Sequence, residues 1–490
     1  MELSRATLGM LPATITRPRY DPACLRAGIV HLGFGGFHRA HMARYTHDLN
    51  DRRPADLQWG IIGAGLMAAD ARTRDALAPQ DALYTLIEQQ GDERTATVVG
   101  SVCKVLLAAG DARDLLAAME DPAIRIVSLT VTENGYCLNS ATKTLDRRHP
   151  AIEYDIVHPG NPRSAIGILV EAFRRRMVAG APAFTAMSCD NIQHNGRVLK
   201  EAVLAFAAAR DRKLADWIAA NASFPNTMVD RITPVLQQGQ AEQFAAWFGV
   251  TDRSPVFCER FRQWVIEDSF VAGRPAWEEV GAQFVADVAP YEFMKLRLLN
   301  ASHLALAGVG RLLGYDYIDE TVRDPALAGY VRALMDRETG PTLPDVPGVD
   351  LDAYKAELID RFGNAAIKDT VDRVNADAPL NILLDPIRDR LAAGADADLL
   401  ALALAAWMRR WADRDDPGHG KAAVHPLAGI LRERALSAGP DPRPMLEIRE
   451  VFGALVEHAQ FVAAVGTWLS GFHLRGARAT LDEARGMLRF

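Results

Sequence analysis

The chain of 490 residues has few cysteines, and none of them are placed to act together. The five are widely separated, with no C-x-x-C pair: Cys24, Cys103, Cys137, Cys189 and Cys258. An odd, scattered set is typical of a reducing compartment, so we expect a cytoplasmic protein without disulfides. The spacing also argues against a structural zinc site.

The sequence also lacks an H-E-x-x-H motif. His38 and His41 are three residues apart, but neither a carboxylate nor a thiol stands close to them in the sequence. Zinc sites in proteins are built from several such ligands. We therefore interpret the two histidines as structural or cofactor-adjacent and expect no metal.

Long apolar runs and an excess of positive charge are missing as well. No run is long enough to cross a bilayer, and Met1–Arg5 is not a basic region followed by an apolar core. The formal net charge is −7, with 49% hydrophobic and 24% charged residues. These values predict a globular protein with no nucleic acid or membrane partner.

The length and the periodicity indicate two domains of different type. The first half alternates strand-like and helix-like stretches, which predicts a parallel sheet with helices on both faces. After about Asp287 the strand signals largely vanish and helical spacing dominates. We predict an α/β domain over 1–286 and a mainly α-helical domain over 287–490. The expected strands are 28–32, 59–63, 82–87, 96–100, 124–132 and 183–189, and the expected helices are 39–49, 165–179, 295–314, 325–337, 351–362, 366–375, 399–412, 445–458 and 461–471.

A glycine-rich turn follows the first predicted strand. Gly33 and Gly35 begin the pattern G-x-G-x-x-G, but His38 replaces the third glycine. Glycines allow a backbone to approach a pyrophosphate at the start of a helix, so the turn favours a Rossmann-type, doubly wound dinucleotide domain. A plain strand-to-helix turn is the alternative. Asp70 is the acid nearest the second glycine turn, and Arg72 close by leaves NAD versus NADP open.

The most unusual segment is the predicted helix that starts at Lys295. At about 100° per residue, Lys295, Asn300 and His303 fall within roughly 140° of one face of an otherwise apolar helix. Burying such groups is costly without a polar partner, and desolvation lowers the pKa of a lysine toward that of a general base. The alternative is an amphipathic helix with a solvated polar edge.

Three weaker motifs follow predicted strands. Asn191, at the carboxyl end of a strand, is placed to donate to an oxyanion, although Asx-rich turns are common there. Thr132-Glu133 and Asp230-Arg231 follow other strands, and an isolated Asp-Arg pair is most often a surface ion pair.

Taken together, these motifs resemble the polyol-specific long-chain dehydrogenase family, also called the mannitol dehydrogenase family. The matching segments appear in family order over most of the chain: 29–41, Thr132-Glu133, 188–191, 229–232 and 295–303. The resemblance implies a metal-independent NAD(P)-dependent dehydrogenase that interconverts a sugar alcohol and its 2-ketose. It also implies a monomer, because family members of this length are often monomers.

The resemblance assigns a role to each site residue. Lys295 is implied as the general base, Asn191 and Asn300 as the oxyanion hole, His303 as a group that orients Lys295 or binds a substrate hydroxyl, and Glu292 as part of a proton-exit route. Asp230 and Arg373 resemble contacts to the remaining substrate hydroxyls. The implied cofactor contacts are Gly33, Phe34, Gly35, His38 and Glu133.

Two departures leave the substrate and the cofactor preference open. Many relatives carry a lysine after the helix that holds Arg373, whereas here 374–381 contains none. Because a uronate carboxylate would favour an additional cation, its absence favours a neutral polyol over a hexuronate such as fructuronate or tagaturonate. Ala68 and Ala69 also stand where some NAD-specific relatives carry acids, so NADP is not excluded. A catalytically silent protein would be expected to have lost Lys295.

Overall fold

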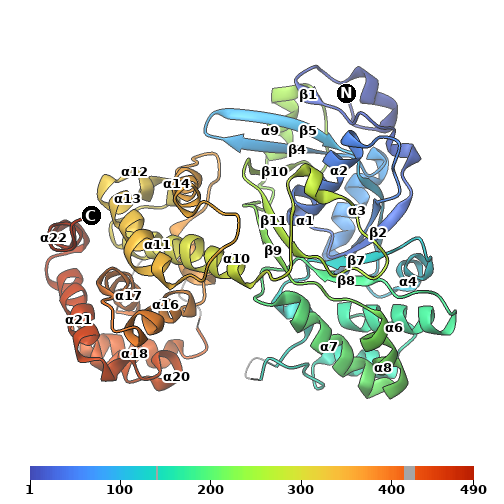
Figure 1. The fold of residues 1–490 in the computed structure, drawn as a ribbon. Coiled ribbons are helices and arrows are strands. Elements are labelled where there is room, and N and C mark those ends of the chain that lie inside the picture. Colours follow the sequence, from blue (N-terminus) through green and yellow to red (C-terminus); the bar gives the residue numbers. More distant parts are fainter. Residues whose placement is uncertain (140–141, 413–424) are drawn as a thin grey trace. The chain divides into compact units, whose positions relative to one another are not determined.

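The computed structural model describes residues 1–139, 142–412 and 425–490. The chain forms two compact units, Met1–Ala289 and Pro290–Phe490, which are described one at a time (Figure 1). In neither unit does a helix of the described residues combine the length and apolar character needed to cross a membrane.

The first unit is built on a five-stranded sheet in the order β6-β3-β2-β7-β8. Every neighbouring pair in it is parallel. The first strand of the sheet therefore lies at its centre, as in doubly wound dinucleotide-binding folds. The predicted Rossmann-type sheet is confirmed. Its strands are β2 (Ala27–Leu32), β3 (Gly60–Gly65), β6 (Val102–Leu107), β7 (Ile126–Leu129) and β8 (Thr185–Ser188).

Helices cover both faces of this sheet, and successive side chains of each strand point to opposite faces. Val30 packs into an apolar cluster with the helices α4, α6, α7 and α8, whereas its neighbour Ile29 packs into a second cluster with α1 and α2. The β-branched runs read from the sequence are therefore strands covered on both sides. The helices of the unit are α1 (Gly36–Ala40), α2 (Met42–Arg52), α3 (Ala71–Leu77), α4 (Arg113–Glu120), α5 (Pro150–Val157), α6 (Ala165–Val178), α7 (Asn195–Arg210), α8 (Arg212–Asn221) and α9 (Gln240–Phe248).

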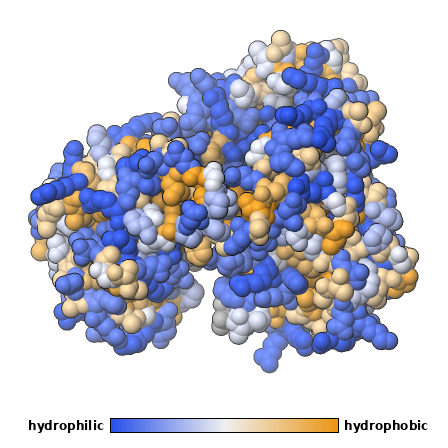
Figure 2. Space-filling model, in the orientation of Figure 1, coloured by the Kyte–Doolittle hydropathy of each residue, from blue (hydrophilic) through white to orange (hydrophobic). Residues whose placement is uncertain are grey.

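The remaining strands form two smaller sheets. The predicted strand pair near 82–100 is the antiparallel hairpin of β4 (Tyr84–Gln90) and β5 (Glu93–Val99), which lies outside the parallel sheet. Figure 2 shows hydrophilic surface over this hairpin, where Glu93 and Arg94 are exposed. The other strands are β1 (Ile15–Thr16) and β10 (Val256–Glu259) beside the hairpin, and β9 (Thr227–Asp230), β11 (Gln263–Glu267) and β12 (Gln283–Val285) in the third sheet.

The second unit is helical, as predicted, and contains no strand among its described residues. At its centre lies α17, whose residues 399–408 are all buried, and α11 packs beside this helix, with Gly308 facing Ala406. The helices are α10 (Ala289–Met294), α11 (Ala301–Leu312), α12 (Ile318–Arg323), α13 (Pro325–Leu334), α14 (Leu351–Phe362), α15 (Val371–Asp377), α16 (Asn381–Ala392), α17 (Asp398–Trp411), α18 (Ala428–Ala438), α19 (Arg443–Leu446), α20 (Arg449–Phe452), α21 (Ala459–Leu474) and α22 (Ala477–Leu488).

Two helix predictions in this unit are wrong in their bounds. The helix expected over 366–375 begins at Val371, because the Thr370 side chain caps it by accepting a hydrogen bond from the Arg373 backbone N–H at 3.2 Å. The helix expected over 445–458 is instead three short pieces, α19, α20 and a 3-10 turn at Leu455–Glu457, and Gly453 with a φ of 61° ends α20.

Candidate functional site

The glycine turn lies at the carboxyl end of β2, the central strand. Gly33 has a φ of +84°, and a Cβ at this position would lie 2.1 Å from the Thr130 carbonyl oxygen. Only glycine fits such a close approach. The backbone N–H groups of Gly33 and Phe34 both donate to the Ala64 carbonyl, at 2.9 and 3.2 Å, which closes the turn against β3. The turn therefore stands where the strand order of the sheet reverses, as in dinucleotide sites.

Phe34 and His38 form the buried floor of this turn, whereas Gly35 is exposed. The Phe34 ring packs so tightly that a Cβ on Gly63 would lie 2.4 Å from it. The His38 ring stacks on His31 at 3.5 Å, and neither of its nitrogens has a hydrogen-bond partner among the described residues. Burial lowers the pKa of His38 well below its usual range, so the imidazole is neutral at pH 7.

The two acids predicted to lie near a cofactor have protein partners of their own. Asp70 Oδ2 accepts hydrogen bonds from the backbone N–H groups of Leu66 and Met67, each at 2.9 Å, so this carboxylate shapes the loop after β3. Glu133 follows β7, is exposed and forms an ion pair with Lys143 at 3.0 Å.

Asn191 and Asp230 lie at the carboxyl ends of β8 and β9, with Asn191 exposed and Asp230 buried. Next to Asp230, the Arg231 side chain is buried, forms an ion pair with Glu88 and donates to the Ala40 carbonyl at the end of α1. Arg231 is therefore a buried structural cation. The interpretation of the Asp-Arg motif as a surface ion pair is wrong.

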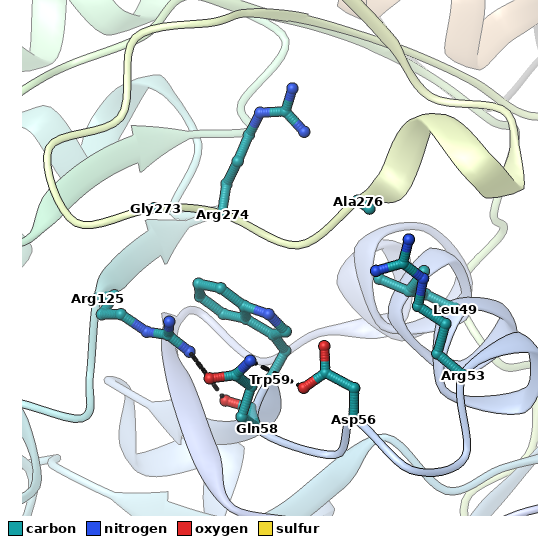
Figure 3. A pocket seen from close by; sticks show the side chains of 9 residues that line it. All are labelled: Leu49, Arg53, Asp56, Gln58, Trp59, Arg125, Gly273, Arg274 and Ala276. Carbon is teal, nitrogen blue, oxygen red and sulfur yellow. Dashed lines mark hydrogen bonds between the residues drawn. The ribbon is translucent and has the colours of Figure 1, made fainter.

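A pocket in the first unit is lined by three arginines but lies at the opposite edge of the sheet. Its volume is about 220 Å³, and Trp59 and Arg125 line it from the amino ends of β3 and β7. Figure 3 shows the Arg125 side chain beside Trp59 and Gln58; its guanidinium lies 3.5 Å from the Trp59 ring and donates to Gln58 Oε1 at 3.0 Å. The other two arginines of the pocket are paired with carboxylates: Arg53 with Glu279, and Arg274 with Asp268 and Glu278. In doubly wound folds, dinucleotides bind at the carboxyl ends of the parallel strands. This pocket lies at the amino ends and is therefore separate from the glycine turn.

The helix predicted over 295–314 contains a π-helical segment at Lys295–Asn300, followed by α11. Within it the Ala301 N–H donates to the Leu296 carbonyl, five residues earlier. The spacing of about 100° per residue therefore does not apply here, because a π turn places residues five apart near each other. Asn300 follows Lys295 by one such turn. Lys295 is 8% exposed, so the interpretation of this segment as a solvated polar edge is wrong.

His303 and Arg373 of the second unit share a carboxylate that the sequence analysis did not single out. Asp369 accepts two hydrogen bonds from the Arg373 guanidinium, at 2.5 and 2.6 Å, and its Oδ2 lies 3.4 Å from His303 Nε2. Asp369 is 8% exposed and His303 lies beside it, whereas the Arg373 side chain is 48% exposed, so solvent screens the Asp369–Arg373 pair in part. The spacing of four residues between Asp369 and Arg373 could have indicated their pairing. No pattern indicated that Asp369 would also lie beside His303.

Each unit thus gathers part of the predicted set. In the first, the glycine turn, Glu133 and Asn191 all follow strands of one parallel sheet and so lie at its carboxyl edge. In the second, Glu292, Lys295, Asn300 and His303 follow one another along α10, the π-helical segment and α11. Among the described residues, no group of three or more His, Cys, Asp or Glu side chains is arranged to hold a metal ion.

Comparisons with known proteins give one family for both units. The mannitol dehydrogenase Rossmann domain matches residues 27–279, and the mannitol dehydrogenase C-terminal domain matches 287–471. D-mannonate oxidoreductase of Escherichia coli is 44% identical, covering 95% of this chain and 97% of that protein. Mannitol dehydrogenase DSF1 of Saccharomyces cerevisiae is 40% identical, covering 98% and 97%.

Two solved structures resemble the whole chain. Mannitol 2-dehydrogenase of Pseudomonas fluorescens, in a ternary complex with NAD and D-mannitol, is 42% identical with a TM-score of 0.86 and 100% coverage of both chains. A D-sorbitol dehydrogenase in substrate-free form is 34% identical with a TM-score of 0.90, covering 98% of this chain and 100% of that one.

Proposed function

Because the chain belongs to the mannitol dehydrogenase family, we propose that it is a metal-independent enzyme that interconverts a sugar alcohol and its 2-ketose with NAD. The observation that carries this proposal is the likeness, over the full length of both chains, to a mannitol 2-dehydrogenase whose structure contains NAD and D-mannitol. The buried Lys295 in its π-helical turn agrees with it, since π-bulges are frequent at functional sites.

The proposed chemistry divides one oxidation into a proton transfer and a hydride transfer. Lys295, in its neutral form, removes the proton of the C2 hydroxyl, and the proton leaves by the route that includes Glu292. NAD, when bound, accepts the hydride from C2. Asn191 and Asn300 donate hydrogen bonds to the oxygen as it gains negative charge, and donors placed for such an oxygen commonly contribute a large part of catalysis.

The other site residues are proposed to hold the reactants. Asp369 keeps His303 and Arg373 oriented, so that His303 orients Lys295 or binds a substrate hydroxyl, while Asp230 and Arg373 contact the remaining hydroxyls. Residues 1–286 would bind the dinucleotide, with Gly33 and the exposed Gly35 of the turn at the pyrophosphate and the buried Phe34 and His38 supporting the turn. We propose that the enzyme is cytoplasmic, which its five free cysteines support. We also propose that it acts as a monomer.

Removing divalent metal ions is expected to leave the activity unchanged. The proposed mechanism assigns the base to an amine and the oxyanion to two amides, so no step calls for a Lewis acid. The measurement is the rate of polyol oxidation before and after dialysis against a chelator. A loss of activity that added zinc restores would refute the metal-independent mechanism.

A hexuronate reductase on the same fold is the second candidate. The observation that favours it is the 44% identity to a D-mannonate oxidoreductase, whose named substrate carries a carboxylate. Against it stands the segment 374–381, which contains no lysine to meet such a charge. The neutral polyol is therefore our first proposal.

The deciding experiment compares ketoses and keto-uronates as substrates. NADH and NADPH are supplied separately with fructose, xylulose, sorbose, fructuronate or tagaturonate, and the loss of reduced-nicotinamide absorbance is followed. Faster oxidation of NADH with a ketose supports the proposal and tests the cofactor preference at the same time. Oxidation with a keto-uronate alone would establish the second candidate instead.

A further inference from the structure

Asp190 joins the loops that follow β7 and β8. Its Oδ1 accepts a hydrogen bond from the Thr132 backbone N–H at 2.7 Å, and its Oδ2 accepts from the Val131 N–H at 3.1 Å and the Tyr136 hydroxyl at 2.9 Å. The Asp190 side chain is buried, and burial raises the pKa of this carboxyl while the three hydrogen bonds oppose that rise. One carboxylate therefore binds three donors of the neighbouring loop.

The loop held in this way is strained. Thr132 has a φ of 61° and a ψ of 170°, a conformation that residues other than glycine rarely adopt. Such strain persists only where the surroundings over-determine the backbone, and it is common at functional sites. A charged acceptor on the Thr132 N–H supplies that constraint, because hydrogen bonds to ionised groups are stronger than neutral ones.

The backbone of Asp190 is fixed from both sides as well. Its N–H donates to Ser188 Oγ at 3.2 Å, and its carbonyl accepts from Asn195 Nδ2 at 3.0 Å and from the Ile192 N–H at 2.8 Å. Asn195 in turn accepts from the Thr227 N–H at 2.9 Å, which ties α7 to β9. The peptide that leads into Asn191 therefore has little freedom to move.

We infer that Asp190 is a positioning residue whose buried carboxylate fixes the backbone that presents Asn191 to the substrate oxygen. The inference rests on the proposed function, in which Asn191 is a donor to that oxygen. An amide in place of the carboxylate would offer one acceptor where two oxygens now accept, and its NH₂ would face backbone N–H donors. Asn191 and the strained loop would then shift together.

The chain contains a matched control, Asp155. This carboxylate is also buried and also accepts from two backbone N–H groups and one hydroxyl: those of Arg163 at 2.7 Å, Ser164 at 3.0 Å and Ser164 Oγ at 2.5 Å. None of these partners adjoins a proposed site residue. The variants Asp190→Asn and Asp155→Asn therefore remove similar bonds, only one set of which is linked to Asn191.

The experiment measures kcat, KM and the thermal midpoint of wild type and both variants. We expect similar falls in the thermal midpoint, but a fall in kcat on the order of 10²-fold for Asp190→Asn alone, because small misplacements of reacting groups are that costly. A wild-type kcat for Asp190→Asn, or an equal fall for Asp155→Asn, would overturn the inference. If Asp190→Asn does not fold, Tyr136→Phe, which removes one donor to Asp190, decides: a several-fold lower kcat supports the inference, and an unchanged kcat overturns it.

Hydrogen exchange separates this inference from the proposed function. Wild-type protein that turns over no polyol or ketose rejects the proposed function, and exchange of the amides in 131–137 then decides whether Asp190 fixes the loop. Faster exchange in Asp190→Asn than in Asp155→Asn supports that role. Equal exchange in the two variants overturns it.

Discussion

Replacing Lys295 with alanine is expected to lower the rate of polyol oxidation by about 10²–10⁴-fold, the usual contribution of a general base. The affinity for NAD is expected to change little, because the glycine turn proposed to bind it belongs to the other unit. The side chain is buried in a π-helical turn with Asn300 one turn later, and π-helical turns are frequent at functional sites. The measurements are kcat for oxidation and the dissociation constant for NAD.

Lys355→Ala is the matched control for this prediction. Lys355 is the same residue type in the same unit and is similarly buried, it is not a proposed site residue, and it forms ion pairs with Asp336 at 2.8 Å and with Asp352 at 3.3 Å. Its removal should reduce stability and leave kcat close to wild type. Near-normal turnover of Lys295→Ala, or an equal loss of kcat in both variants, would contradict the assignment of Lys295 as the base.

Replacing Arg176 with methionine is expected to destabilise the protein by about 3 kcal/mol or more, since each buried polar group left without a partner costs about 1–3 kcal/mol. The fully buried guanidinium donates to four backbone carbonyls: those of Met119 at 2.8 Å, Asp121 at 2.6 Å, Ile124 at 2.8 Å and Pro182 at 3.0 Å. A methionine side chain fills much of the same volume but cannot donate a hydrogen bond to any of these carbonyls.

Arg174→Met tests whether this loss is specific. Arg174 lies two residues earlier on the same helix, but its side chain is 40% exposed and its ion pair is with Glu171, which Arg175 and Arg210 also neutralise. Glu171 is buried, but it keeps Arg175 and Arg210 when Arg174 is removed, so we expect a loss of only about 0–1 kcal/mol. Urea denaturation of both variants gives the comparison, and equal midpoints for the two would show that the four carbonyls do not depend on Arg176.

Much of the fold could be predicted because its signals are local. Ile29 and Val30 belong to a β-branched run that any parallel sheet would bury on both faces, and the helical spacing after Asp287 requires no knowledge of partners. The three consecutive arginines at 174–176 show the limit of such signals. They look alike in the sequence, yet two pair with carboxylates and the third is buried against backbone carbonyls of other segments.

For the proposed site, the sequence pointed to candidate residues but not to the contacts that support them. The polar residues in the apolar run at Lys295 were visible, but the π-helical turn depends on backbone hydrogen bonds that no spacing rule encodes. Asp190 lies in the matching segment 188–191 and Asp369 lies four residues before Arg373, but the sequence did not indicate which other groups each carboxylate contacts, because tertiary structure brings those groups to it. Asp70 shows the opposite case, since it was predicted from its distance to a glycine turn and is found bonded to its own loop.

The measurement that tests the central claim most directly is the fate of the hydrogen at C2 of the substrate. Wild-type enzyme is incubated with NAD and a sugar alcohol that carries deuterium at C2, and the mass of the NADH formed is determined. Our account predicts NADH that carries the deuterium, with the 2-ketose as the other product. NADH without deuterium, or no NADH with any sugar alcohol, would contradict it.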